Sequence, residues 1–136
     1  MAKDRFHNVV RKALEKEGWT ITADYYEINV GDFKFQVDLA AERLLAAERE
    51  GQKIAVEVKS FIAPSHVSDF HMALGQFLNY RDALAVKEPD RTLFLAVRSP
   101  VYETFFQGKF IAASVKRYEL RLVVYDVENE VFTKWL

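Results

Sequence analysis

Apolar residues near the start of the chain recur at the spacing of one helical face. They lie between Asp4 and Glu17 and are separated by charged residues: Phe6, Val9, Val10, Ala13 and Leu14. Gly18 follows at the position where glycine often ends a helix, because glycine adopts a positive φ without steric cost. The pattern predicts an amphipathic helix over residues 4–17.

Two extended runs follow this helix. Residues 19–30 are rich in Thr, Ile, Tyr and Val, and residues 33–39 alternate around Phe33, Phe35 and Val37. Gly31 and Asp32 separate the runs, and such a pair is typical of a tight turn. We therefore expect the two runs to form a hairpin.

Residues 40–50 carry conflicting signals. Their composition favours a helix, but Glu50 and Gly51 form a turn signal that leads directly into the extended run at residues 53–61. A short turn would return the chain beside itself. We therefore expect a strand over at least Leu44–Arg49, antiparallel to Ile54–Val58.

A second amphipathic helix is expected after Pro64, with Ser65 or Ser68 at its start. Its apolar stripe runs toward Lys87 and should pack on the sheet: Phe70, Ala73, Leu74, Phe77 and Leu84. Residues 92–98 are almost continuously apolar, which is typical of a strand covered on both faces.

The remaining chain indicates two short helices over residues 101–118, broken near Gly108, and a terminal hairpin of residues 120–127 and 131–136. The order is α-β-β-β-α-β with later additions, which predicts an α/β fold: a mixed central sheet flanked by helices, with a C-terminal β-hairpin. The sequence contains no repeat and no linker, so we expect residues 1–136 to form a single domain.

Composition narrows the class of protein. Half of the residues are hydrophobic and 29% are charged, a balance typical of a globular protein. The chain has no cysteine, so any metal would be held by oxygen or imidazole ligands. The first residues resemble no signal peptide, and no stretch approaches the length of a membrane span. We expect a cytoplasmic protein that does not contact membranes.

The net charge of −1 counts against tight, nonspecific binding of nucleic acid, which usually requires a strong basic excess. A local basic groove remains compatible with this charge. Two groups of residues are candidates for such a groove: Arg11 and Lys12, or Lys116, Arg117 and Arg121.

The segment IAVEVKSF, residues 54–61, holds the most informative pattern. The period of a strand places Glu57 and Lys59 on the same face, although the flanking residues are apolar. Carboxylates hold divalent cations, and an ammonium group steadies an attacking water or developing negative charge during phosphodiester hydrolysis. Asp38 is the candidate second carboxylate. The alternative is a surface ion pair on an edge strand.

Three further residues are candidates for the same site. Gln76 and Tyr80 are four residues apart and share a face of the second helix, at the flank of its apolar stripe. They could instead be a solvent-facing amide and a tyrosine at the edge of the core. His7 lies beside the apolar stripe of the first helix and could add a ligand if that helix crosses the sheet. A helix-surface histidine without a role is the alternative.

The element order, together with Asp38, Glu57-x-Lys59 and Gln76-x-x-x-Tyr80, resembles the PD-(D/E)XK restriction-endonuclease-like superfamily, the last motif being similar to its RecB-like members. A closer resemblance, over almost the whole chain, is to the XisH family of element excision controlling factors. It is carried by these segments: FHNVVRKALEKEGW, VDLAAERLLAAEREGQKIAVEVKSF, GQFLNYRDAL and RLVVYDVENEVF.

The resemblance implies a restriction-endonuclease-like fold and a part in excising a DNA element during cyanobacterial differentiation, beside a small partner, XisI, and a separate recombinase. Asp38 and Glu57 would bind Mg²⁺ (or Mn²⁺), Lys59 would assist the water, and Gln76 and Tyr80 would support the site or contact nucleic acid. The expected partners are DNA, an XisI-like protein and, in a homodimer, a second copy. A catalytically silent nuclease-fold adaptor that binds such a partner is the alternative.

The spacing of the two carboxylates departs from this pattern, whereas the position in the first helix does not. The first-helix position, often acidic or histidine in the superfamily, falls closest to His7. If the turn centres on residues 50 and 51, Glu57 lies opposite Leu44, and Asp38 is six residues beyond that position. Either the intervening residues form a bulge or excursion, or Glu42 rather than Asp38 faces the site.

Overall fold

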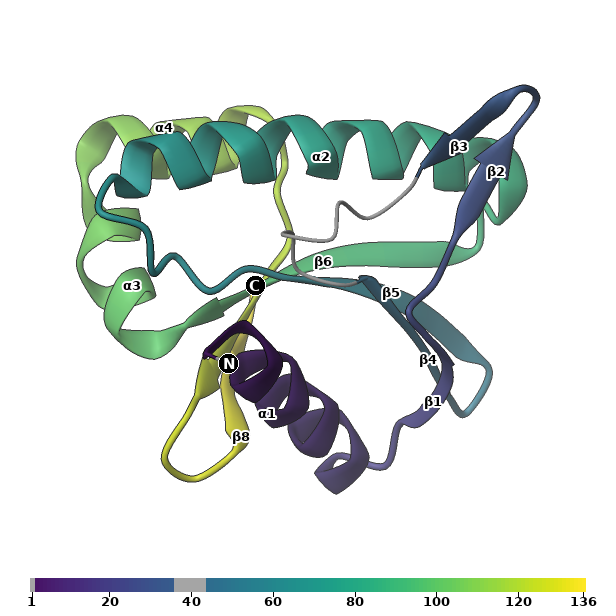
Figure 1. Cartoon of the computed structure of the whole chain (residues 1–136), viewed down its shortest axis with the longest axis horizontal. Helices are drawn as coiled ribbons and strands as arrows, with labels where there is room; N and C mark the ends of the chain where they lie inside the picture. Colours follow the sequence, from purple (N-terminus) through teal and green to yellow (C-terminus); the bar gives the residue numbers. More distant parts are fainter. Residues whose placement is uncertain (1, 36–43) are drawn as a thin grey trace.

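The computed structural model of the chain describes residues 2–35 and 44–136 (Figure 1). In chain order its elements are α1 (Ala2–Lys16), β1 (Thr20–Asp24), β2 (Ile28–Val30), β3 (Phe33–Phe35), β4 (Leu44–Arg49), β5 (Gln52–Val58), α2 (His66–Lys87), β6 (Arg91–Arg98), α3 (Ser99–Glu103), the 3₁₀ turn η1 (Phe105–Gln107), α4 (Lys109–Arg117), β7 (Leu122–Asp126) and β8 (Val131–Trp135).

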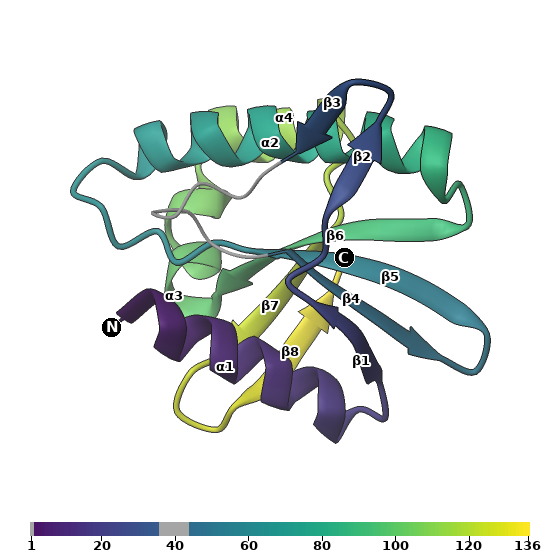
Figure 2. The same ribbon diagram turned by 45° about the vertical axis from the view of Figure 1, so that its right-hand side comes forward.

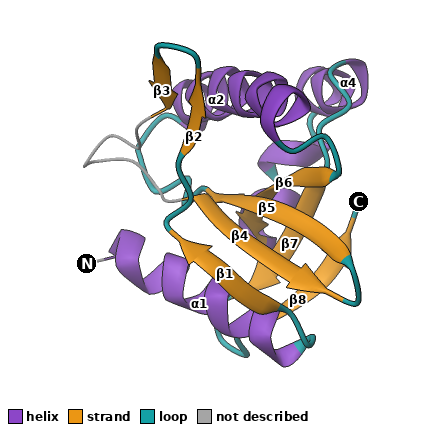
Figure 3. Ribbon diagram, turned by 90° about the vertical axis from the view of Figure 1, so that its right-hand side faces the viewer, coloured by secondary structure: helices purple, strands orange, loops and turns teal. Residues whose placement is uncertain are grey.

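The main sheet has six strands in the order β1-β4-β5-β6-β7-β8. Strands β5, β6 and β7 run parallel, while β1, β4 and β8 pair antiparallel with their neighbours. Helix α1 covers one face, and α2 and α4 lie over the other, as Figures 2 and 3 show. The predicted mixed sheet flanked by helices, with its C-terminal hairpin, is therefore confirmed.

Alternate residues of the central strands enter two separate apolar layers. On β5, Ile54, Val56 and Val58 join the layer under α1, whereas Ala55 joins the layer under α2. Strand β6 behaves in the same way, with Leu95 on the α2 side and Ala96 on the α1 side. This two-sided burial is what the continuous apolar run of β6 predicted.

Helix α1 ends as its sequence indicates. Gly18 has a φ of +87°, and its N–H donates to the Glu15 carbonyl at 3.0 Å, while the Trp19 N–H donates to the Leu14 carbonyl at 3.0 Å. These two bonds form a Schellman cap. Leu14 and Trp19 both enter the layer under α1, so the cap also directs the chain into β1.

The hairpin expected from residues 19–30 and 33–39 is only partly right. Residues 28–35 form a hairpin, β2 with β3, but it is a separate two-stranded sheet, and β1 pairs with β4 instead. The reason is burial on two sides: Ile21 packs in the layer under α1, whereas Ile28 packs in the layer under α2. Between these two residues the chain leaves the main sheet and crosses from the layer under α1 to the layer under α2. Residues 36–39 lie outside the described residues.

The crossing segment is held by Tyr26. Its hydroxyl donates to a Glu88 carboxylate oxygen at the end of α2, and the Arg91 guanidinium carbon lies 5.2 Å from its ring centroid. An Arg91 guanidinium nitrogen also lies 3.1 Å from a Glu88 carboxylate oxygen. Burial, and then the hydrogen bond to Glu88, raise the pKa of Tyr26 to about 12. This network fixes the β2–β3 hairpin against α2.

The expected β4–β5 hairpin is confirmed. Glu50 and Gly51 both have positive φ, 51° and 82°, as a two-residue type I′ turn requires. The register pairs Arg49 with Gln52 and places Leu44 opposite Glu57. The turn therefore outweighs the helical composition of residues 40–50, because β4 gains a ladder with a buried neighbouring strand.

Helix α2 begins where one of the two candidate caps predicted. The Ser65 side chain accepts a hydrogen bond from the Ser68 N–H at 3.1 Å. The helix spans 22 residues and buries Phe70, Phe77 and Leu84 on the sheet. Within residues 2–35 and 44–136, no helix has the length and apolar character needed to cross a membrane.

Replacing Ser65 by alanine should lower the free energy of unfolding by about 1 kcal/mol, because the first turn of α2 loses its side-chain acceptor. Ser68→Ala is the matched control, since Ser68 contributes only its backbone N–H to this cap. Urea unfolding of both variants measures the difference. Equal losses in the two variants would show that the cap does not stabilise α2.

Candidate active site

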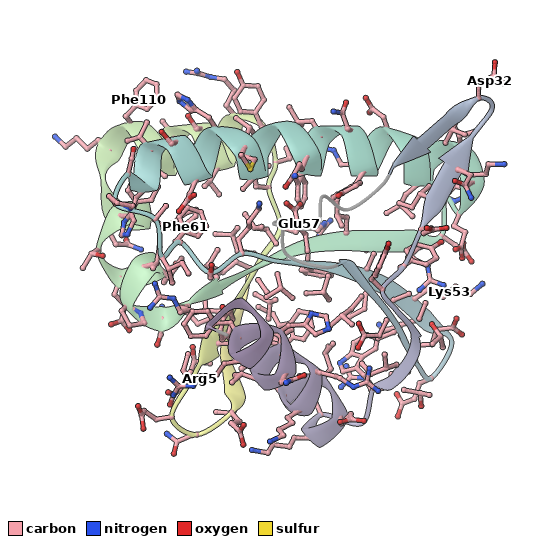
Figure 4. All side chains as sticks on the ribbon, viewed as in Figure 1. Arg5, Asp32, Lys53, Glu57, Phe61 and Phe110 are labelled. Carbon is pink, nitrogen blue, oxygen red and sulfur yellow. The ribbon has the colours of Figure 1, made fainter. Side chains whose placement is uncertain are left out.

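Glu57 lies in the interior of the molecule rather than at its surface. Its side chain is only 2% exposed, and β5 pairs with β4 on one side and β6 on the other, so it is not an edge strand. Glu57 is two residues after Ala55 on the same strand, so its side chain lies on the same face of the sheet, the α2 side. Figure 4 shows Glu57 between the sheet and α2. The alternative of a surface ion pair on an edge strand is therefore wrong.

Lys59 is the residue immediately after β5. Its backbone N–H donates to the Ala96 carbonyl of β6 at 3.1 Å, and its carbonyl accepts from the Tyr125 hydroxyl at 3.4 Å. Strand parity keeps Lys59 on the face of Glu57, and it too is buried, with 5% of its surface exposed. A carboxylate and an ammonium group therefore both lie at the end of a central strand.

Tyr80 of α2 faces the same layer. It is buried among the apolar residues between α2 and the sheet, and its pKa is raised to about 12, first by burial and then by the negative charge of Glu57. The hydroxyl therefore stays protonated at neutral pH, as a hydrogen-bond donor beside the carboxylate. Gln76 lies one helical turn earlier on α2 and is half-buried.

The energetics of this arrangement indicate function rather than stability. Moving a carboxylate from water into a protein interior costs several kcal/mol even after relaxation, and its pairing seldom returns more than that. An apolar side chain at residue 57 would suit the α2 layer better, as Ala55 does on the same face. Buried charges of this kind are typical of sites that bind ions or perform proton chemistry.

Only part of the predicted metal-binding set can be placed. Glu57 fits as one oxygen ligand for a hard divalent cation. Asp38 and its alternative, Glu42, lie outside the described residues. Among residues 2–35 and 44–136, no group of three or more His, Asp or Glu side chains could hold a metal ion. The described residues alone therefore do not complete a metal centre.

His7 is buried on α1 and binds an acidic residue that the sequence pattern did not single out. Its Nε2 lies 2.8 Å from Asp24 Oδ1 at the end of β1, and Arg11 donates to the other oxygen of Asp24 at 2.5 Å. These contacts fasten α1 to β1. His7 is therefore buried and hydrogen-bonded, and the alternative of a helix-surface histidine without a role is wrong. Nothing local in the sequence marks Asp24, because its partners are 17 and 13 residues away.

One of the two candidate basic grooves is neutralised. Arg11 pairs with Asp24, and the Lys12 ammonium lies 3.3 Å from a carboxylate oxygen of Glu130. The other candidate group lies at the end of α4 and the start of β7, where its side chains are exposed: Lys116, Arg117 and Arg121.

These features define a class: a mixed α/β protein with an acidic and a basic side chain buried at the end of a central strand. The model of one family, described as XisH protein, matches residues 1–133. The chain belongs to the XisH family.

Two crystal structures support this membership. An XisH family protein from Nostoc punctiforme PCC 73102 is 49% identical, with a TM-score of 0.91 over 98% of this chain and 99% of that one. A fdxN element excision controlling factor protein from Anabaena variabilis is 51% identical, with a TM-score of 0.90 over 97% of this chain and 98% of that one. No curated protein matches the chain. The resemblance to the XisH family is confirmed, and the wider PD-(D/E)XK relationship stays a prediction.

The position of Tyr80 predicts a specific dependence of stability on pH. Its folded pKa of about 12 lies above its ordinary value of 10.0, so the neutral hydroxyl stabilises the fold below pH 10.0. This contribution is lost as the pH rises toward 12. Tyr80→Phe should therefore lose less stability between pH 9 and about pH 11 than the unmodified protein does.

Urea unfolding at the two pH values tests this expectation, with Tyr118→Phe as a control because Tyr118 is exposed. The assigned environment of Tyr80 is wrong if both variants show the same loss of stability between the two pH values.

Proposed function

We propose that this protein takes part in the excision of a DNA element and hydrolyses phosphodiester bonds with the help of a divalent cation. The observation that carries the proposal is the burial of Glu57 and Lys59 together at the end of β5. The relative from Anabaena variabilis, described as an excision controlling factor, supports the biological setting. The cytoplasm is the location that we propose for this role, because it is where a protein acting on a bacterial chromosome would meet its DNA.

Glu57 and Asp38 are the residues proposed to hold Mg²⁺ or Mn²⁺, with Glu42 as the alternative to Asp38. The bound ion would supply Lewis-acid activation of a water molecule and neutralise charge on the phosphate. Lys59 donates from its ammonium group to the attacking water or to a phosphate oxygen, where negative charge develops. Burial strengthens this interaction, because little water screens it.

Tyr80 and Gln76 are proposed to support the site from α2. The Tyr80 hydroxyl keeps its proton at neutral pH, and its proposed role is to donate a hydrogen bond to the substrate near Glu57. Gln76 has both a donor and an acceptor one turn earlier on the helix, suited to a phosphate or sugar of the substrate. His7, bonded to Asp24, orients α1 against the strands that precede the site.

A second candidate function is a catalytically silent adaptor that binds an XisI-like protein. The pairing of Arg11 with Asp24 and of Lys12 with Glu130 favours it, because it removes two cations from the surface available to DNA. The adaptor requires no metal. It predicts that the complex with the partner survives Lys59→Ala and that the protein never cleaves DNA.

Glu57→Gln should reduce cleavage at least about a hundredfold, because the amide retains the shape of the side chain but binds a divalent cation poorly. The assay uses nicked, branched and single-stranded DNA with Mg²⁺ or Mn²⁺. Glu103→Gln is the control, since Glu103 is an exposed residue of α3 that loses the same charge. Circular dichroism verifies that both variants are folded.

Absence of cleavage of every substrate by the folded, unmodified protein would overturn the hydrolytic proposal. Co-purification of that inactive protein with an XisI-like partner would then support the adaptor.

A further inference from the structure

We propose that a second site, at the opposite end of β5 from Glu57, binds an unpaired nucleotide of a single-stranded nucleic acid. The choice of a nucleic acid as ligand rests on the proposed function. The site is an open cleft of about 600 Å³ near the β4–β5 turn, the end of α1 and the last strand, β8. Six aromatic or basic residues among those that line it carry the argument: Trp19, Phe94, Trp135, Arg49, Lys53 and Arg121.

The aromatic side of the cleft is assembled from three distant parts of the chain. The Trp135 ring centroid lies 6.1 Å from that of Trp19 and 5.0 Å from that of Phe94, with Phe94 edge-on at 89°. Phe94 and Trp135 are only partly buried, although they pack against the layer under α1. Partly open aromatic rings offer a surface on which a base stacks, whatever its sequence.

The indole N–H of Trp135 has a hydrogen-bond acceptor, whereas that of Trp19 has none among the described residues. Trp135 Nε1 donates to a Glu17 carboxylate oxygen at 3.1 Å, which fixes the orientation of its ring. Trp19 is 5% exposed, and its Nε1 has no hydrogen-bond partner among the described residues. A buried donor without an acceptor is unfavourable.

Three cations line the cleft, and two of them are already engaged. The Arg49 guanidinium carbon lies 4.4 Å from the Trp19 ring centroid, and Arg49 donates to the Glu17 carbonyl at 2.8 Å. The Lys53 ammonium lies 3.4 Å from an Asp90 carboxylate oxygen. Arg121 is exposed, and no carboxylate in residues 2–35 or 44–136 pairs with it. Its guanidinium is therefore available for the phosphate that accompanies a stacked base.

The location separates this cleft from the candidate active site. Lys53 and Glu57 are four residues apart on β5, which is about 13 Å along a strand. Ile54 lines the cleft and packs in the layer under α1, whereas Glu57 lies on the α2 side. A base pair inside a duplex cannot stack on the rings, because the neighbouring base pairs cover both of its faces. The ligand is thus an unpaired end or a single-stranded segment.

The two tryptophans of the cleft are the only tryptophans in the chain, so intrinsic fluorescence reports directly on this site. Oligothymidylate should change the emission in a saturable way, whereas a duplex closed by a loop at each end, and lacking unpaired thymidines, should not. Two further titrations use thymidine monophosphate and inorganic phosphate in place of the oligonucleotide. The monophosphate should bind more weakly than the oligonucleotide, and phosphate should leave the emission unchanged.

Arg121→Gln should weaken binding of oligothymidylate about tenfold and reduce the slope of log affinity against log salt by about one, as expected for one lost phosphate contact. Arg5→Gln is the matched control, since Arg5 is exposed and lies on the other side of the molecule from Lys53 (Figure 4). Trp135→Leu, followed by anisotropy of a labelled oligonucleotide, should weaken binding at least about tenfold through loss of stacking.

The site is refuted if oligothymidylate leaves the emission unchanged, if a duplex changes it equally, or if the Arg121 and Arg5 variants weaken binding to the same extent. Glu57→Gln should reduce cleavage at least about a hundredfold but leave the fluorescence change intact. Unmodified protein that binds oligothymidylate without cleaving any DNA refutes only the hydrolytic proposal. Protein that cleaves without the fluorescence change refutes only this cleft.

Discussion

The burial of Glu57 and Lys59 is the constraint on which the rest of the structure depends. Two charged groups at the end of a central strand cost several kcal/mol to remove from water, against a total stability of about 5–15 kcal/mol for a typical domain. The surrounding fold offsets this cost with apolar residues on both faces of the sheet. Tyr80 adds a donor that stays protonated beside Glu57.

The two-sided sheet also explains the path of the chain before the site. The β4–β5 turn fixes the register that places Leu44 opposite Glu57, and Asp38 precedes Leu44 by six residues. Between β1 and β4 the chain leaves the layer under α1 and packs Ile28 under α2, where Tyr26 fastens it. In the sequence, this departure from the main sheet comes immediately before residues 36–43, which contain both candidates for the second carboxylate, Asp38 and Glu42.

Features set by neighbouring residues could be predicted from the sequence. Glu50-Gly51 determines the β4–β5 register, Ser65 starts α2, and the period of a strand places Glu57 with Lys59. The split of residues 19–30 could not be predicted, because it depends on which layer receives each apolar residue. The contact of His7 with Asp24 was missed for a similar reason, since it joins elements that are distant in sequence.

The central claim is that the Glu57 carboxylate is buried in order to hold a divalent cation. Electron paramagnetic resonance of Mn²⁺ measures this directly without DNA, because the signal of the free ion falls as the ion binds. The unmodified protein should bind Mn²⁺ at least about tenfold more tightly than Glu57→Gln, as expected from the loss of one charged ligand. Equal affinity of the two proteins for Mn²⁺ would contradict the claim.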